Sequence, residues 1–188
     1  MEPEERAHEL IERLSSLMRA ESRRADGALQ PVQLQALTYL ARCNRYSDTP
    51  GALTEYLCLT KGTVSQTLNV LEREGLVARQ EDASDRRRVR LVLTPAGRAR
   101  ARAAAPPPVA RDALAALGAV RIGRLADELE ALLRALQRAR GGQSFGVCRT
   151  CRHYQPQGSD RGRCGLTGEP LDRRDSSKLC REHEVSVG

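Results

Sequence analysis

Large aromatic side chains are nearly missing from this sequence of 188 residues, which has no tryptophan and only one phenylalanine. A hydrophobic core must therefore be built mainly from leucine, valine and alanine. No aromatic-lined pocket can be placed, so the sequence neither supports nor excludes an organic effector. Runs of about 18 consecutive apolar residues, which a membrane-spanning helix needs, are also missing.

Lysine is scarce as well, with Lys61 and Lys178 the only two, so that arginine carries nearly all of the positive charge behind the net charge of +7. The segment from Ala78 to Arg102 holds eight arginines and three acidic residues. Such a concentration of positive charge is typical of a surface that meets nucleic-acid phosphates, although an anionic membrane surface would also attract it. The N-terminal residues are acidic and lack the apolar core of a signal peptide, so we expect a soluble, cytoplasmic protein.

A helix with one polar face is predicted between Thr60 and Gly75. Thr60 is a suitable N-cap, and Gly75 stands where a left-handed residue ends a helix. Val64, Leu68 and Leu71 recur at helical spacing and are expected to face a core. A solvated amphipathic helix would show the same pattern, so the neighbouring segments must decide. The opposite face carries side chains that can bond base edges or phosphates in a major groove, namely Lys61, Thr63, Ser65, Gln66, Asn69 and Arg73.

The neighbouring segments predict a winged helix-turn-helix. Thr49 and Pro50 begin a short helix, and a tight connection joins it to the polar-faced helix. Downstream, the segments 76–79 and 89–93 have the pattern of short strands. The polar loop between them would form a wing whose arginines reach the DNA backbone or the minor groove, namely Arg86, Arg87 and Arg88.

From about Leu34 to Gly97, the chain resembles the MarR-type winged helix-turn-helix regulators. The resemblance rests on the string LEREGLVAR, on an Asp-Arg-Arg turn that begins at Asp85, and on a strand that ends in Leu-Thr shortly before Gly97. It implies that Arg87 is directed at the minor groove or at phosphates, and that Asp85 orients Arg87 through a charge-assisted hydrogen bond. It also implies that the protein is a DNA-binding transcriptional repressor and not an enzyme.

Leucine stripes outside this region indicate a dimer. One stripe follows a first helix near the N-terminus, and another follows a long helical pattern from Val109 to Arg140. A helix of that length on one small domain would leave its leucines in water. Relatives of this kind dimerise through N- and C-terminal helices, so the resemblance implies a homodimer on a near-palindromic operator. Pro106, Pro107 and Pro108 must end the helix that begins at Pro95.

The C-terminal tail departs from the resemblance, because four of the six cysteines gather in this polar segment. A cytosolic protein keeps cysteines reduced, and a short polar segment buries too little apolar surface to fold unaided, so we expect a bound metal more than disulfides or a thiol switch. One close pair followed by two separated cysteines resembles the cluster-binding stretch of high-potential iron-sulfur proteins. We therefore favour a 4Fe-4S cluster over zinc, with His153 or His183 as substitute ligands. The expected ligands are Cys148, Cys151, Cys164 and Cys180.

The expected fold class is mainly α with a small β-wing (α+β). We expect four domains in chain order: an N-terminal dimerisation helix (1–30), a winged helix-turn-helix (31–97), C-terminal dimerisation helices (98–140) and a metal-held tail (141–188). The leading interpretation is a DNA-binding regulator that releases DNA when an inducer or the metal state of the tail changes. The alternative is a scaffold protein whose tail docks a protein partner.

Two other interpretations concern the cysteines. A dithiol oxidoreductase that uses Cys148 and Cys151 is not expected, because this pair follows a glycine-rich link and not a strand that leads into a helix N-terminus. Cys43 and Cys58 lie in apolar helical patterns, so both are expected to be small core residues.

Overall fold

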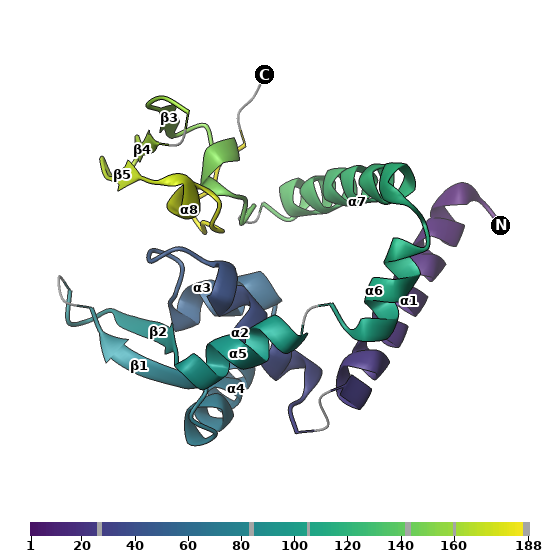
Figure 1. Ribbon diagram of the computed structural model, residues 1–188, viewed down its shortest axis with the longest axis horizontal. Helices are drawn as coiled ribbons and strands as arrows, with labels where there is room; N and C mark the ends of the chain where they lie inside the picture. Colours follow the sequence, from purple (N-terminus) through teal and green to yellow (C-terminus); the bar gives the residue numbers. More distant parts are fainter. Residues whose placement is uncertain (26–27, 83–84, 105, 142–143, 160, 186–188) are drawn as a thin grey trace.

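The computed structural model describes residues 1–25, 28–82, 85–104, 106–141, 144–159 and 161–185, and the structural statements below refer to them. This part of the chain is mainly helical and contains two small antiparallel sheets, one made of β1 and β2 and one in the order β3-β4-β5 (Figure 1). The fold class expected from the sequence is confirmed. The helices are α1 (Pro3–Ala25), α2 (Pro31–Arg42), α3 (Pro50–Leu57), α4 (Lys61–Arg73), α5 (Pro95–Ala104), α6 (Pro108–Ala115), α7 (Ala119–Ala139), α8 (Arg173–Ser176) and the short 3-10 helix η1 (Cys148–Thr150). The strands are β1 (Val77–Glu81), β2 (Val89–Leu93), β3 (Tyr154–Pro156), β4 (Gly162–Cys164) and β5 (Pro170–Leu171).

The helix-turn-helix consists of α3 and α4, and its capping residues are those that the sequence predicts. The Thr49 hydroxyl accepts a hydrogen bond from the N–H of Ala52 at 3.2 Å. The Thr60 hydroxyl does the same for the N–H of Thr63, also at 3.2 Å. Gly75 follows α4 with a φ of +66°, a left-handed conformation that favours glycine. Each cap satisfies main-chain groups that a helix end leaves open.

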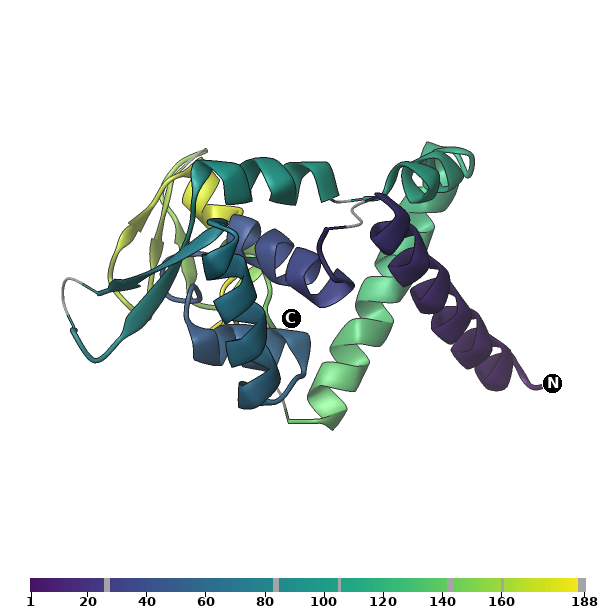
Figure 2. The same ribbon diagram turned by 90° about the horizontal axis from the view of Figure 1, so that it is seen from below.

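The wing is the antiparallel pair of β1 and β2, in which Val77 lies opposite Leu93 and Glu81 lies opposite Val89. The alternation expected along β2 is confirmed, because Leu91 and Leu93 are buried. Gly97 is required where α5 leaves the wing, since a Cβ atom there would lie 2.0 Å from the main-chain oxygen of Leu76. The wing extends from the end of the domain that lies farthest from α1 (Figures 1 and 2).

The C-terminal helices differ in one respect from the sequence prediction. The proline run separates α5 from α6 as expected. The prediction of one long helix from Val109 to Arg140 is wrong, because the segment divides into α6 and α7 at Gly118. Gly118 has a φ of +74°, and its N–H bonds to the Ala115 oxygen at 3.1 Å, so the chain turns there. A leucine pattern shows which face is apolar and does not show where a glycine interrupts the helix.

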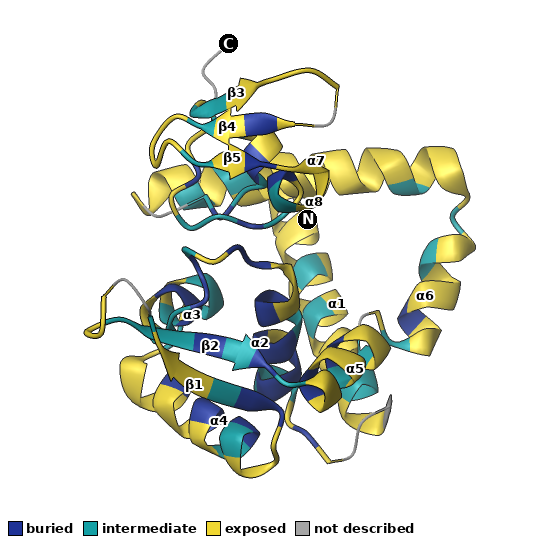
Figure 3. Ribbon diagram, turned by 60° about the vertical axis from the view of Figure 1, so that its left-hand side comes forward, coloured by how far each residue is buried: buried dark blue, intermediate teal, exposed yellow. Residues whose placement is uncertain are grey.

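Helices α1 and α7 expose much of their apolar surface. No residue of α7 is buried, and in Figure 3 this helix has the yellow of exposed residues along most of its length. Leu129 and Leu133 on α7 are 48% and 53% exposed, and Leu10 and Leu14 on α1 are 50% and 55% exposed. No helix in the described ranges is both long enough and apolar enough to cross a membrane.

The tail packs directly on the winged helix-turn-helix. The ring of Phe145 lies edge-on to Tyr56 and Tyr39, with centroids 5.3 and 6.1 Å away, and joins the same buried core. The main chain of Leu179 pairs with the end of α2, because its N–H donates to the Arg42 oxygen and its oxygen accepts from the N–H of Asn44. The tail is therefore attached to the domain by apolar packing and by main-chain pairing (Figure 1).

Candidate DNA interface and cysteine-lined cavity

The polar face of α4 is exposed as the sequence predicts. Val64, Leu68 and Leu71 face the core, and the opposite side is free of large apolar side chains. The carboxamide oxygen of Asn69 accepts a hydrogen bond from the Arg79 guanidinium at 3.1 Å, so the wing strand β1 helps to orient it. The exposed residues of this face are Lys61, Thr63, Ser65, Gln66, Asn69 and Arg73.

The tip of the wing is a tight turn around Asp85. The Asp85 carboxylate accepts the main-chain N–H of Arg87 at 3.0 Å, and the Asp85 main-chain oxygen accepts the N–H of Arg88 at 2.9 Å. Asp85 therefore accepts a hydrogen bond from Arg87 as expected, but from its main-chain N–H, so that the bond shapes the turn. The side chains of Arg86 and Arg87 are exposed at this turn. The arrangement holds two guanidinium groups where a phosphate or a groove could meet them.

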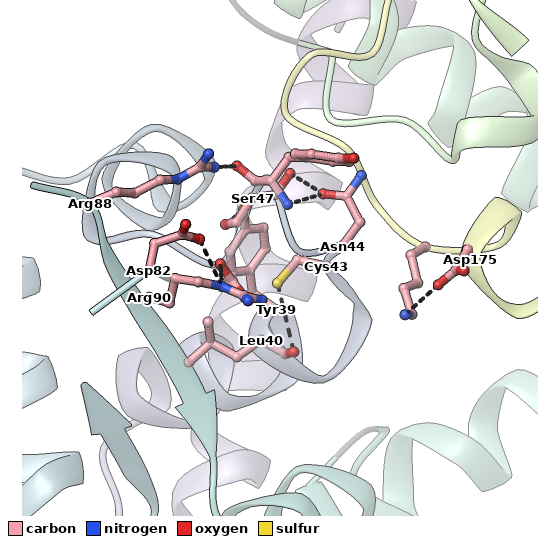
Figure 4. A network of polar contacts seen from close by, with 12 residues as sticks. Tyr39, Leu40, Cys43, Asn44, Ser47, Asp82, Arg88, Arg90 and Asp175 are labelled. Atoms are coloured by element: carbon pink, nitrogen blue, oxygen red, sulfur yellow. Dashed lines mark hydrogen bonds and ion pairs between the residues drawn. The ribbon is translucent and has the colours of Figure 1, made fainter. Parts of the chain in front are cut away.

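Arg88 lies apart from the other expected DNA-binding residues. Its guanidinium donates to the main-chain oxygen of Tyr46 at 2.6 Å, and the side chain is half-buried against the body of the domain (Figure 4). The Arg88 side chain therefore points toward the 43–49 segment and not outward with Arg86 and Arg87. Three consecutive arginines look alike in the sequence, and only the turn at Asp85 decides which of them face outward.

A loop between α2 and α3, here called the 43–49 loop, joins the wing to the rest of the molecule. The carboxylate of Asp48 accepts hydrogen bonds from both Nε and Nη2 of Arg90 on β2, with Nε 3.1 Å from Oδ2. The Asp48 main-chain oxygen accepts the N–H of Leu91 at 2.7 Å. The Tyr39 hydroxyl donates to the main-chain oxygen of Ser47 at 2.7 Å. Figure 4 shows Tyr39, Ser47 and Arg90 around this short segment of chain. The loop and the wing are consequently held as one unit.

The four tail cysteines line a single cavity of about 590 Å³. One wall is the tail, and the other is the 43–49 loop with Arg88 from the wing. The sequence predicts the grouping of the cysteines, but not that the winged-helix domain closes their site. The cysteines come from η1, β4 and the segment after α8, namely Cys148, Cys151, Cys164 and Cys180.

Hydrogen-bond donors surround several of these sulfur atoms. The side-chain amide of Asn44 donates to the Sγ of Cys148 at 3.6 Å, and the N–H of Glu184 donates to the Sγ of Cys151 at 3.5 Å. A hydrogen bond between the side chains of Cys148 and Cys180 raises the pKa of Cys148 and lowers the pKa of Cys180. Among the residues that the structure describes, no three His, Cys, Asp or Glu side chains are close enough to share one metal ion.

The two histidines of the tail have different surroundings. His183 is 4% exposed, and hydroxyl oxygens of Ser144 and Thr150 lie 2.6 and 3.0 Å from its two ring nitrogens. Burial lowers the pKa of His183, which disfavours the charged form of the ring. A Cβ atom at Gly146 would lie 2.5 Å from this ring, which explains the glycine. His153 lines the cavity instead, with its Nε2 3.2 Å from the Glu184 carboxylate.

Only one of the two remaining cysteines is a core residue. Cys43 is buried at the end of α2, and burial raises the pKa of its thiol to about 12. The same expectation for Cys58 is wrong. Cys58 is the exposed C-cap of α3 with a φ of 53°, because the helix ends there and the chain must turn into α4.

The geometry of α3, α4 and the wing is that of a winged helix-turn-helix. Residues 29–88 match the model of the MarR family, a family of DNA-binding regulators and not of enzymes, which agrees with the expectation from the sequence. The matched segment contains the helix-turn-helix and β1, whereas β2 and the tail lie outside it. The sequence has no match among curated proteins.

Solved structures share the fold. A probable transcriptional regulator from Pseudomonas aeruginosa is 26% identical, with 65% of this chain and 93% of that chain covered and a TM-score of 0.51. MepR of Staphylococcus aureus, solved in complex with DNA, is 25% identical, with 68% and 96% covered and a TM-score of 0.56. FabT of Streptococcus pneumoniae, also solved with DNA, is 23% identical, with 73% and 99% covered and a TM-score of 0.59, and supports the fold alone.

Proposed function

We propose that this chain is a transcriptional regulator of the MarR type that represses by binding double-stranded DNA as a homodimer. The observation that carries the proposal is the pairing of an exposed polar face on α4 with an arginine-tipped wing. The α4 face offers the Gln66 amide and the Ser65 hydroxyl to base edges in a major groove. The wing offers Arg86 and Arg87 to phosphates or to the minor groove. The DNA complex of MepR supports this use of the fold.

The exposed leucines support the dimer. Helix α7 has no buried residue, yet leucines recur along one face of it, and α1 has a second stripe of the same kind. Exposed apolar area of this extent is covered when two copies pack their terminal helices together. Two copies related by a two-fold axis would present two α4 helices to half-sites about one DNA turn apart, which predicts a near-palindromic operator.

In this proposal the tail supplies the signal. The tail is attached to the 43–49 loop. The loop in turn holds the wing, because Asp48 binds Arg90 and the Tyr46 main chain binds Arg88. A change in what the cysteines bind would then favour one arrangement of the DNA-binding elements over another. Oxidant, oxygen or metal supply are the signals to which thiolate-bound metal responds.

The test uses the full chain with its tail. Binding to a random-sequence duplex is followed by fluorescence anisotropy at low ionic strength, and the mass in solution is measured by light scattering. We expect a dimer whose DNA affinity falls steeply with salt. A monomer that ignores duplex DNA at low salt would contradict the proposal. A genomic selection with the same protein then yields the operator.

A further inference from the structure

The cavity between the tail and the winged-helix domain is lined by four cysteines, and N–H groups donate hydrogen bonds to two of their sulfur atoms. We infer that it binds a four-iron, four-sulfur cluster through Cys148, Cys151, Cys164 and Cys180, and that Asn44 of the DNA-binding domain is a positioning residue for that cluster. The cluster would thereby bridge the tail and the 43–49 loop. The effect on DNA rests on the proposed function, whereas the binding of the cluster does not.

The size of the cavity favours a cluster over one ion. Zinc bonds to sulfur at about 2.3 Å, which draws four sulfurs to roughly 3.8 Å from one another and leaves no space between them. Among the described residues, no three His, Cys, Asp or Glu side chains are placed to hold one metal ion, whereas the four cysteines line one cavity of about 590 Å³ together with the 43–49 loop. A cluster of iron and inorganic sulfide needs space between its ligands and would take one cysteine at each iron.

The donors around the sulfurs suit thiolates that bind iron. The Sγ of Cys148 accepts from the Asn44 amide, and the Sγ of Cys151 accepts from the N–H of Glu184. Such N–H bonds withdraw charge from a thiolate and set the reduction potential of its cluster. The wall also contains Arg88, whose partner is a neutral main-chain oxygen, so its charge faces a cluster that is negative overall.

Asn44 connects this site to the wing. Its carboxamide oxygen accepts from the N–H of Tyr46 at 3.1 Å and from the Ser47 hydroxyl at 2.8 Å, while its amide nitrogen faces Cys148. From the tail side, the N–H of Arg181 donates to the Ser47 hydroxyl at 2.8 Å. One carboxamide therefore orders the 43–49 loop with one end and bonds a cysteine with the other. An iron-bound Cys148 thiolate would be a stronger acceptor for that amide than a free thiol, so loss of the cluster would weaken this contact of the loop that holds the wing.

The identity of the cofactor is tested on the full chain purified without oxygen and reconstituted with iron salts and sulfide. We expect a brown protein with about four iron and four sulfide per chain and a visible absorption that dithionite bleaches. We expect most of the iron and of the visible absorption to be lost in each of four variants, namely Cys148→Ser, Cys151→Ser, Cys164→Ser and Cys180→Ser. The matched control is Cys58→Ser, which removes an exposed cysteine outside the cavity and should leave the iron content unchanged. A colourless protein with one zinc per chain, or colour that survives all four substitutions, would overturn the inference.

The role of Asn44 is tested with Asn44→Asp, which keeps the two acceptor bonds of the loop and loses the N–H that faces Cys148. We expect the cluster to assemble and its reduction potential to become more negative, because a donor is replaced by a negative oxygen. Thr38→Ala is the control, since the Thr38 hydroxyl bonds to the Leu34 oxygen within α2 and the residue does not line the cavity. A potential equal to that of the unaltered protein would show that Asn44 does not act on the cluster.

The link to the wing is tested by hydrogen exchange on loaded and cluster-free protein without DNA. We expect faster exchange in the 43–49 loop and at the N–H of Leu91 when the cluster is removed. The affinity for DNA should differ between the two forms by at least about fivefold. Equal exchange in both forms would overturn the link. If exchange responds and neither form binds DNA, the proposed function fails while the cluster site stands.

Discussion

Arg90 of β2 binds the carboxylate of Asp48 through both Nε and Nη2, so a wing strand is fixed to the loop before the helix-turn-helix. The Asp48 side chain is only 11% exposed, and the pairing raises the pKa of Arg90. The next residue on the wing, Leu91, donates its N–H to the Asp48 main chain. The orientation of the wing relative to α3 and α4 is therefore determined largely by one aspartate.

Replacement of this aspartate should destabilise the domain. Asp48→Ala leaves the half-buried Arg90 guanidinium with only the more distant Asp82 carboxylate, 3.9 Å from its Nε, which we expect to lower the free energy of unfolding by about 2 kcal/mol. Asp48→Asn keeps the shape and one acceptor and should cost less. Chemical denaturation followed by circular dichroism measures both. Asp112→Ala, on the exposed side of α6, should stay within about 0.5 kcal/mol of the unaltered protein. If Asp48→Ala unfolds at the same denaturant concentration as Asp112→Ala, Asp48 does not hold the wing.

At the wing tip, Arg87→Ala should weaken binding to all duplex sequences alike. Loss of a phosphate contact reduces the slope of log affinity against log salt by about 0.9 per contact. Titrations at several salt concentrations give that slope. Arg13→Ala on α1 removes an identical charge from an exposed site far from the wing and should leave the slope unchanged. An unaltered slope for Arg87→Ala would remove this residue from the interface.

On α4, Gln66→Ala and Ser65→Ala should alter sequence preference. Each side chain is exposed on the face expected to enter the major groove, so its loss should cost on the order of 1 to 3 kcal/mol at one base position of the operator. Binding is compared between the selected operator and variants changed at single positions, with a scrambled duplex as the reference. We expect the affinity for the scrambled duplex to stay constant. If each substitution lowered the affinity equally for every operator variant, α4 would not read bases.

Much of the winged helix could be predicted because its signals are local. Thr49 and Thr60 are side chains whose capping bonds reach only three residues along the chain, and Gly75 acts through its own main-chain angle. Arg88 could not be predicted in the same way. Its partner, the Tyr46 main chain, lies 42 residues earlier, and nothing in an arginine run indicates such a contact.

The tail shows the same limit more strongly. Cysteine spacing predicts a shared site, since ligands for one cofactor must converge. The outer wall of that site comes from Asn44, which precedes Cys148 by 104 residues and resembles any loop asparagine. The anchoring of Phe145 between Tyr39 and Tyr56 is also a contact between distant segments. The scarcity of aromatic residues was the one available sign, because three of the five in the chain meet at this point.

The leucine face of α7 should hold the dimer together. Leu129→Lys places a charge in the stripe and should give a monomer with much weaker operator binding. Because no residue of α7 is buried within one chain, the substitution should leave the secondary structure of the monomer intact. Asp127→Lys, two residues away and so on the opposite side of the helix, should remain dimeric. Light scattering decides between them, and a dimeric Leu129→Lys would place the interface elsewhere.

The packing of the tail should weaken in acid because of His183. Burial lowers the pKa of this imidazole below the value of about 6.5 that it has in an unfolded chain. The unfolded state then binds the proton more readily, so the stability contributed by the neutral ring is full above about pH 6.5 and falls as the pH drops below it. His183→Gln can still bond Ser144 and Thr150 and cannot titrate, so its stability should depend less on pH between about 5 and 7. Thermal unfolding across that range measures the difference, with His8→Gln on α1 as an exposed control that should follow the unaltered protein. If His183→Gln and His8→Gln lose stability in parallel on acidification, the acid sensitivity arises from another group.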